Sequence, residues 1–221
     1  FILKPYNNNN HFILINDGST DKTQIFLDKF YKRFSKKRKS NILLIKNKKN
    51  MGVGYSFNKV LKICKTKYIM PIPGDNDMHL QNFKKYLKKD IDFIMFYKAN
   101  MELYSRNRYV LTMLFRMFYG YCFDVQVNYI QSPCIYKCKI LKKIKIYSNR
   151  MSFWPEINIK VLKSNIKYSE EPMIFRNKSN IDRTVSQKNF IEVVYRFIII
   201  FIDIKFLNKK FYKVKAKKVY V

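Results

Sequence analysis

FILINDGSTD, residues 12–21, is the stretch that decides the fold, because four apolar residues run directly into an acidic turn that contains glycine. A short apolar run of this kind is typical of a buried strand. Asn, Asp and Gly favour turns, and Ser, Thr and Asp favour the position that starts a helix. The stretch therefore predicts a buried strand, a turn and a helix in direct succession.

The same succession recurs along the chain. Amphipathic segments alternate with further apolar runs at 42–45, 68–72 and 93–97. This alternation predicts an α/β fold, with a mostly parallel sheet covered by helices on both faces. Ligands of such sheets bind at the carboxyl ends of the strands. Asp17 and Asp75 both follow a predicted strand, so we expect them to lie close together.

The turn PGDND, residues 73–77, carries two carboxylates two residues apart. In a turn, Asp75 and Asp77 can face one hard cation, and oxygen ligands favour Mg²⁺ or Mn²⁺. Such an ion also binds phosphate oxygens and neutralises a diphosphate leaving group. The alternative is an ordinary Gly-Asp-Asn turn without a ligand, which these residues favour in any case.

Three segments taken in order resemble the family-2 glycosyltransferases of GT-A fold: ILINDGSTDKT (13–23), NKKNMGVGYSFNKVL (47–61) and YIMPIPGDNDM (68–78). The remainder is more loosely similar to the polyprenyl (dolichyl)-phosphate sugar transferases of that family. The resemblance implies a metal-dependent, hexosyltransferase-like enzyme that transfers a sugar from a nucleotide diphospho-sugar with inversion. The opening strand of the family is absent, so we expect an N-terminally truncated chain. Tyr97-Lys98-Ala99 replaces the usual Gly-Ser-Arg after the fifth strand.

The resemblance implies a role on the donor side for several residues. Asp17 would contact the nucleoside, and Asp75 and Asp77 would hold the metal and the diphosphate. Arg176 would reach the donor diphosphate. His79 stands where the subgroup has a Gln near the metal, so it is a further candidate metal ligand.

Two carboxylates are candidates for a general base, which a hydroxyl acceptor needs. Asp124 lies in a D-x-Q segment like that of the subgroup and is the first candidate. Glu156, on a predicted helix at 155–162, is the second. Both residues are equally compatible with a purely structural role. A lipid phosphate as acceptor is already anionic and needs no base.

The chain divides in this interpretation into a catalytic domain at 1–186 and a C-terminal part at 187–221. Apolar residues between 190 and 202 recur at helical spacing, and seven lysines follow from Lys205 to Lys218. The pattern suits an amphipathic helix in a membrane interface with lysines against anionic head groups. The alternative is a helix packed on the catalytic domain. We expect the lysine-rich residues 205–221 to be loose.

Composition limits the class of protein. The net charge is +30, but the lysines are spread along the chain and no nucleic-acid-binding motif is present, so we expect no nucleic-acid partner. No apolar run is long enough to span a membrane, and the four cysteines lack metal or redox spacing.

We therefore expect a cytoplasmic protein, peripheral on the inner face of a membrane, that takes part in cell-envelope glycan synthesis. Its donor would be a nucleotide sugar, and its acceptor a polyprenyl phosphate or a growing glycan. The alternatives are a basic nucleic-acid-binding protein and an inactive glycosyltransferase-like fragment.

Overall fold

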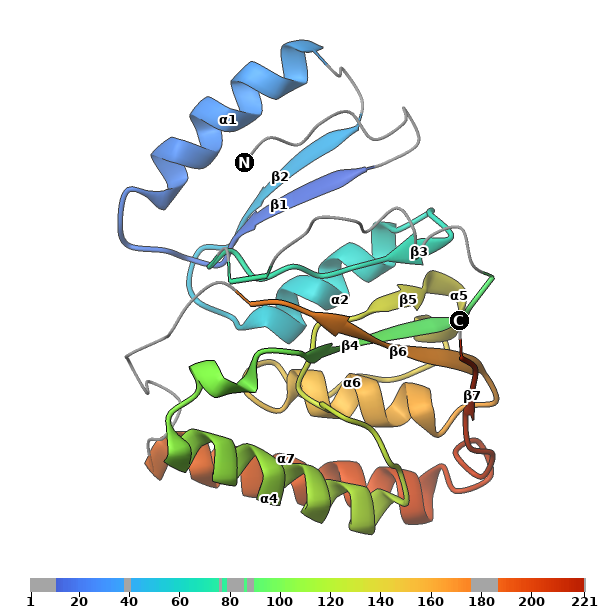
Figure 1. Ribbon diagram of the computed structural model, residues 1–221. Coiled ribbons are helices and arrows are strands. Elements are labelled where there is room, and N and C mark those ends of the chain that lie inside the picture. Colours follow the sequence, from blue (N-terminus) through green and yellow to red (C-terminus); the bar gives the residue numbers. More distant parts are fainter. Residues whose placement is uncertain are drawn as a thin grey trace. The chain divides into compact units, whose positions relative to one another are not determined.

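The computed structural model describes residues 11–37, 41–75, 77–78, 86, 90–175 and 187–220. The chain divides into two compact units, Phe1–Thr66 and Lys67–Val221. Figure 1 shows the helices and strands of each unit. All four cysteines are free thiols.

The first unit is a strand–helix–strand–helix succession, as the sequence predicts. Strand β1 (Phe12–Asn16) pairs in parallel with β2 (Ile42–Lys46), and α1 (Thr23–Lys37) connects them. Helix α2 (Val53–Ile63) follows and buries Phe57, Val60 and Leu61 along one side. The parallel pairing follows from the connection, because a helix that crosses over returns the chain to the end where the first strand started.

The second unit holds a five-stranded sheet in the order β3-β5-β4-β6-β7. The strands are β3 (Tyr68–Ile69), β4 (Phe93–Lys98), β5 (Ile135–Lys137), β6 (Lys167–Met173) and β7 (Lys217–Lys218). Strands β4, β6 and β7 run parallel to one another, whereas β5 is antiparallel to both of its neighbours. The α/β class with a mostly parallel, helix-flanked sheet is therefore confirmed, with one reversed strand.

The reversal of β5 has a visible cause in the segment before it. Helix α4 (Arg106–Phe123) leads away from the end of β4, and the chain then turns back along the helix. The hydroxyl of Tyr129 hydrogen-bonds at 3.1 Å to that of Tyr104, which precedes the helix. Because this return retraces α4, the chain enters the sheet from the opposite end.

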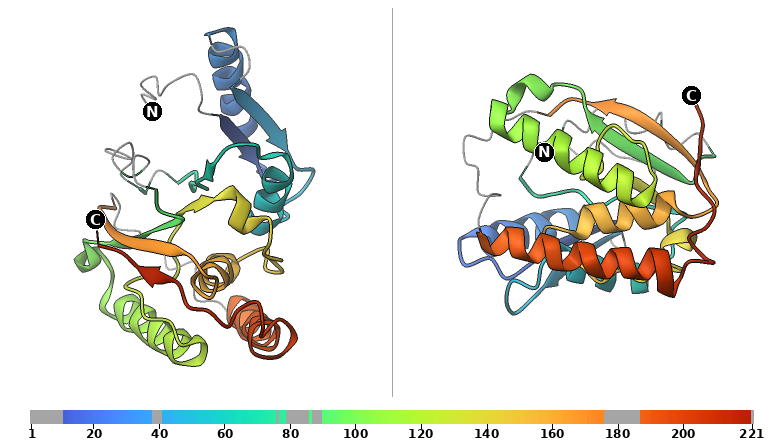
Figure 2. Two further views of the ribbon diagram at one scale, coloured as in Figure 1. Left: turned by 90° about the vertical axis from the view of Figure 1, so that its right-hand side faces the viewer. Right: turned by 90° about the horizontal axis from the view of Figure 1, so that it is seen from below.

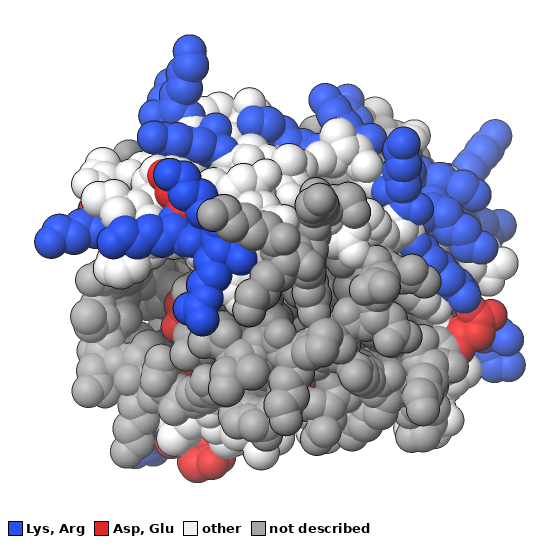
Figure 3. All heavy atoms as spheres, turned by 90° about the horizontal axis from the view of Figure 1, so that it is seen from above, with Lys and Arg blue, Asp and Glu red and all other residues white. Residues whose placement is uncertain are grey.

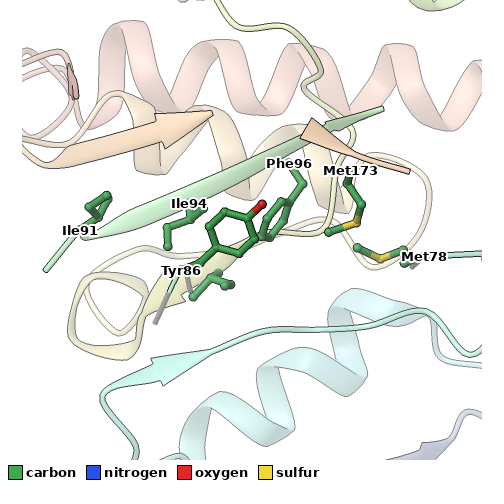
Figure 4. Packing of buried hydrophobic residues seen from close by; sticks show 7 residues of the cluster. Met78, Tyr86, Ile91, Ile94, Phe96 and Met173 are labelled. Carbon is green, nitrogen blue, oxygen red and sulfur yellow. The ribbon is translucent and has the colours of Figure 1, made fainter. Parts of the chain in front are cut away.

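The two faces of the second sheet carry different apolar sets. Figure 4 shows Met78, Tyr86, Ile91, Ile94, Phe96 and Met173 gathered on one face. On the other face Phe93 stacks on Tyr136 at a centroid distance of 5.2 Å. Tyr136 donates a hydrogen bond of 2.7 Å to Asn158 of α6 (Phe153–Leu162), so this face lies against α6.

Helices α4 and α7 (Gln187–Ile202) lie side by side at the bottom of Figure 1 and in both views of Figure 2. The ring of Phe197 is 4.9 Å from that of Phe118 and 5.5 Å from that of Phe123. The predicted C-terminal amphipathic helix is thus present, and a π-helical turn, η2 (Asp203–Leu207), follows it. Among the described residues, no helix combines the length and hydropathy that crossing a membrane requires.

The expectation that residues 205–221 are loose is wrong for part of this segment, which packs on the second unit. Tyr212 is 4% exposed, and β7 pairs in parallel with β6. The amides of Ala216 and Val219 donate to the carbonyls of Leu162 and Tyr168, each at 2.8 Å. Lysine side chains suit the outermost strand of a sheet, where they hinder pairing with another chain, so a lysine-rich composition did not exclude a strand.

Figure 3 shows Lys and Arg side chains projecting from several separate places on one face, with few acidic side chains among them.

Candidate functional site

The acidic turn of the second unit follows β3. The backbone N–H of Asp77 donates to Oδ1 of Asp75 at 3.1 Å, an arrangement that holds a short Asp turn closed. Asp75 is exposed and Asp77 partly exposed. The next residue, Met78, is buried and bridges to Phe175, just beyond β6. The turn is therefore fixed to the sheet through its neighbour while its carboxylates stay accessible.

A buried lysine lies beside this turn. Lys98 ends β4 and is only 4% exposed. Its ammonium lies 4.0 Å from the ring centroid of Tyr104 and 5.0 Å from that of Phe175. Burial lowers the pKa of Lys98; the Asp77 carboxylate opposes this effect and the Arg108 guanidinium adds to it. A desolvated cation thus faces an acidic turn.

The surroundings of Lys98 add a second cation and a rigid frame. The guanidinium of Arg108 lies 4.3 Å from the centroid of the same Tyr104 ring. Asn100 binds the backbone of Phe175 twice, donating to its carbonyl at 2.7 Å and accepting from its N–H at 3.0 Å. This corner therefore combines accessible carboxylates with two positive groups held on aromatic rings.

The sequence showed Lys98 only as a departure from the family pattern. The available signal was a lysine that closes the otherwise apolar strand FIMFYK, residues 93–98. A charge at the end of a buried strand needs a nearby partner or ligand, and that rule would have identified it.

Asp17 forms a network inside the first unit. Its carboxylate accepts from Nδ2 of Asn47 at 2.7 Å, from the N–H of Met51 at 3.1 Å and from the N–H of Gly52 at 2.7 Å. Burial acts to raise the pKa of Asp17, but these bonds and one from Ser56 outweigh it and hold the pKa below its usual value. The carboxylate therefore ties the end of β1 to the start of α2.

The glycine after Asp17 makes this approach possible. Gly18 has φ +73°, and a Cβ placed on it would lie 2.3 Å from the carbonyl carbon of Lys49. Any other residue would be strained there and would push the two segments apart. The turn of the first motif is thus set by close packing against the segment that opens α2.

Replacing Asp17 with asparagine is expected to destabilise the first unit by about 1.5–3 kcal/mol, since charge-assisted hydrogen bonds are lost. Hydrogen exchange of residues 47–63 measures this loss. Because the folded-state pKa is depressed, the stabilisation is complete above the unfolded pKa of about 3.9 and disappears as pH falls through the lower folded value. Asp28→Asn, on the exposed side of α1, is the control. Equal protection of parent and Asp17→Asn protein at neutral pH would contradict the assigned network.

Asp124 lies at the far end of α4 from the acidic turn. It occupies the C-terminal cap in the left-handed conformation, with φ 56°. The helix spans about 27 Å and starts next to Tyr104, which contacts Lys98. The Lys215 ammonium holds the pKa of Asp124 below its usual value, which weakens it as a base. Its catalytic role stays a prediction, and the geometry favours helix capping.

Glu156 is 0% exposed and bound on all sides. Its carboxylate accepts from the N–H groups of Tyr147 and Ser148 at 2.9 and 2.7 Å. Lys160 pairs with it at 2.7 Å and with the buried Asp203 at 2.6 Å. A role as base would require this network to open, so that role also stays a prediction.

The remaining predicted site residues do not share one described unit. Asp17 belongs to the first unit and the acidic turn to the second, so their closeness stays a prediction. His79 and Arg176 lie outside the described residues. Within the described part of the chain, no group of three His, Cys, Asp or Glu side chains could hold a metal ion.

Residues 2–145, well over half of the chain, match the model of glycosyl transferase family 2. The chain belongs to this family. The family match confirms the resemblance carried by the three sequence segments, and the mixed sheet flanked by helices agrees with the GT-A type that the resemblance implies.

The family-2 chain is also similar to individual proteins. An uncharacterized protein of Methanocaldococcus jannaschii is 37% identical over 81 residues, which are 35% of this chain and 34% of that protein. The chain thus spans about a third of the length of the curated relative it matches. The crystal structure of glucosyl-3-phosphoglycerate synthase from Mycobacterium tuberculosis, with Mn²⁺, uridine diphosphate and glucosyl-3-phosphoglycerate, matches 87% of this chain and 68% of its own, with a TM-score of 0.47 and 11% identity.

The acidic turn of this family-2 chain fits a divalent cation. Its two carboxylates supply the hard oxygen ligands that Mg²⁺ and Mn²⁺ prefer, and Mg²⁺ sites commonly combine one or two carboxylates with substrate phosphates. The accessible position of Asp75 leaves room for such phosphates.

Proposed function

We propose that the chain is the donor-binding part of an inverting, metal-dependent glycosyltransferase that uses a nucleotide diphospho-sugar. The observation that carries the proposal is the accessible Asp75–Asp77 turn beside the buried Lys98, in a chain of glycosyl transferase family 2. Negative charge that develops on a leaving diphosphate is stabilised by cations placed in advance. A turn that holds a metal ion supplies this kind of stabilisation on the donor side.

On the donor side, Asp75 and Asp77 would hold Mg²⁺ or Mn²⁺, with His79 as a further ligand. The ion, when bound, neutralises the diphosphate as it leaves. Asp17 would contact the nucleoside with the part of its carboxylate that its network leaves accessible, and Arg176 would bind the diphosphate.

On the acceptor side, we propose a phosphate rather than a neutral hydroxyl. Lys98 and Arg108 lie beside the acidic turn, whereas Asp124 caps the distant end of α4 and Glu156 is enclosed. A phosphate oxygen attacks the anomeric carbon, and the bond to the donor diphosphate breaks with its electron pair on the leaving group. Two cations would orient that oxygen, and no proton has to be removed first.

This acceptor chemistry suits a polyprenyl phosphate, and it places the reaction at a membrane surface. The apolar helix α7 and the lysines that follow it support peripheral association with an anionic inner leaflet. Synthesis of a cell-envelope glycan is the process in which such an enzyme would act.

Replacing Lys98 with methionine is expected to raise the KM for a polyprenyl phosphate at least about tenfold, since one charge-assisted phosphate contact is lost. Methionine keeps the length and the apolar packing of the side chain, so the fold should persist. Lys163→Met is the matched control, because Lys163 is also buried and its pKa is also lowered by burial. An unchanged acceptor KM in Lys98→Met, with normal donor binding, would contradict the acceptor assignment.

The proposed function is tested by thermal shift with UDP- and GDP-sugars, with and without Mn²⁺. A ligand that binds only the folded state raises its stability by about 2.7 kcal/mol at a hundred times its Kd. We expect a shift that depends on Mn²⁺ for one nucleoside class. Absence of any shift across the panel, for a protein that unfolds cooperatively, would contradict donor binding.

A further inference from the structure

Helix α4 presents apolar side chains to solvent, which reverses the usual arrangement of a surface helix. Its outward stripe recurs at helical spacing and consists of Val110, Leu111, Leu114, Met117, Phe118 and Tyr121. Their exposed fractions run from 46% for Val110 to 90% for Tyr121. A helix that only covers a core turns such residues inward and polar ones outward, so this stripe needs another explanation.

Helix α7 carries a second outward stripe of the same kind, made of Phe190, Ile191, Val194, Tyr195, Ile198 and Ile202. The charged pair within the helix, Glu192 and Arg196, is instead the less exposed, at 24% and 27% for the side chains. The same helix buries Ile200 completely against its own unit. It therefore packs on the domain with one side, as the alternative interpretation of this segment expects, and leaves an apolar side open.

The two stripes form one surface, here called the α4–α7 face. Phe118 contacts Phe197, and Phe123 lies 6.0 Å from Phe201, so the helices run side by side in the same direction. Figure 2, in its right-hand view from below, looks onto both helices. Exposed apolar patches that extend over two helices mark protein or membrane contact sites.

The charges around the face identify the partner. Residues 204–220, which follow α7, contain seven lysines and no acidic residue, and residues 106–123 contain three arginines and no acidic residue. Lys209, Lys210 and Lys213 are exposed. An apolar centre with basic groups at its ends complements a bilayer interface, where acyl chains lie below anionic head groups.

We propose that the α4–α7 face docks on an anionic lipid bilayer, with the outward stripes of both helices entering the interface. The proposal extends the membrane association proposed above. Only the link between docking and a lipid acceptor rests on the proposed function. It differs in the elements that bind, since α4 contributes six exposed apolar residues to this face, as α7 does, and α4 gave no such signal in the sequence.

The test is cosedimentation of the full chain with phosphatidylcholine vesicles that do or do not contain phosphatidylglycerol. Leu114→Glu combined with Ile198→Glu is expected to weaken binding to the anionic vesicles at least about tenfold, because each change places a charge in the apolar interface. Ile25→Glu combined with Phe26→Glu is the matched control. These residues are 55% and 66% exposed on α1 and produce the same change in net charge, so binding should stay within about twofold.

The two double variants distinguish binding through the α4–α7 face from binding through other surfaces of the protein. Equal binding by the face variant and the parent protein, or no binding by the parent, would overturn the proposal. Without lipid, light scattering measures the mass of the parent protein. If this mass doubles as the concentration rises, and Leu114→Glu with Ile198→Glu removes the doubling, the α4–α7 face binds a second copy of the chain and the proposal is overturned. Donor-induced thermal shifts of the same proteins test the proposed function independently. Leu114→Glu with Ile198→Glu changes only outward side chains, so this variant should show the same donor-induced shifts as the parent protein.

Discussion

Replacing Asp77 with alanine is expected to abolish the Mn²⁺-dependent thermal shift produced by a nucleotide sugar. At a hundred times its Kd, the donor should raise the unfolding temperature of the parent protein by roughly 5–10 °C for a chain of this size. The variant should show almost none of this shift. The turn has two carboxylates, and removal of one leaves too few oxygen ligands for a stable site between protein and diphosphate.

The ligand-free variant should unfold close to the parent protein. Asp77 is partly exposed, and its backbone N–H, which closes the turn on Asp75, remains in the variant. Loss of its carboxylate leaves Lys98 less compensated, which lowers stability by no more than about 1 kcal/mol for a site at the surface.

Asp90→Ala is the control for loss of negative charge in the same unit. Asp90 is exposed and pairs with Lys67 and Lys137 away from the turn, so its removal should leave the donor shift intact. Asp75→Ala should behave as Asp77→Ala does. Parental Mn²⁺-dependent shifts in both turn variants would show that the metal site lies elsewhere.

The sequence predicted the elements whose signals are local. Apolar runs followed by Asn, Asp or Gly predicted β1, β2 and the start of α2. The positive φ of Gly18 confirms the predicted turn after β1. The class of the fold follows from the order of these elements, and the family from the motifs they carry.

The features that depend on contacts distant in sequence could not be predicted. The direction of β5 depends on a loop that retraces α4, and β7 forms only because β6 offers its edge to a lysine-rich segment. Apolar residues recur at helical spacing along α4, but this spacing does not show that they face solvent, because a period does not say which neighbour lies on which side. The candidate role of Lys98 depends on its contacts with the rings of Tyr104 and Phe175, which the sequence does not show.

Glu156 shows the same limit at a candidate site residue. Glu156 and Lys160 are four residues apart, a spacing that predicts a pair on one side of a helix. Asp203, which also pairs with Lys160, lies 43 residues after Lys160 in the chain. The sequence made Glu156 a candidate general base, whereas its contacts place it in a buried group of three charges.

Replacing Lys160 with methionine is expected to destabilise the second unit by about 3–5 kcal/mol, since it removes the one cation between two buried carboxylates. Lys160 is 0% exposed, and its partners Glu156 and Asp203 have side chains 0% and 2% exposed. Lys160 also donates to the carbonyl of Lys145 at 2.6 Å, and this acceptor would lose its donor.

The measurement is urea unfolding followed by the fluorescence of Trp154, the only tryptophan, which lies in the same helix, α6, as Glu156 and Lys160. Lys163→Met, at the end of the same helix, is the matched control and should change stability by less than about 1 kcal/mol. Glu156→Gln should cost about 1–3 kcal/mol, because the pair of Lys160 with Asp203 remains and backbone hydrogen bonds weaken.

The same variants decide the role of Glu156. If the residue is structural, Glu156→Gln lowers the urea midpoint while turnover per folded molecule stays within about threefold of the parent, since a lost general base costs about a hundredfold or more. A drop of that size at unchanged stability would identify Glu156 as the base and overturn the structural assignment. Unaltered stability in Lys160→Met would show that the three charges do not hold α6 and η2 together.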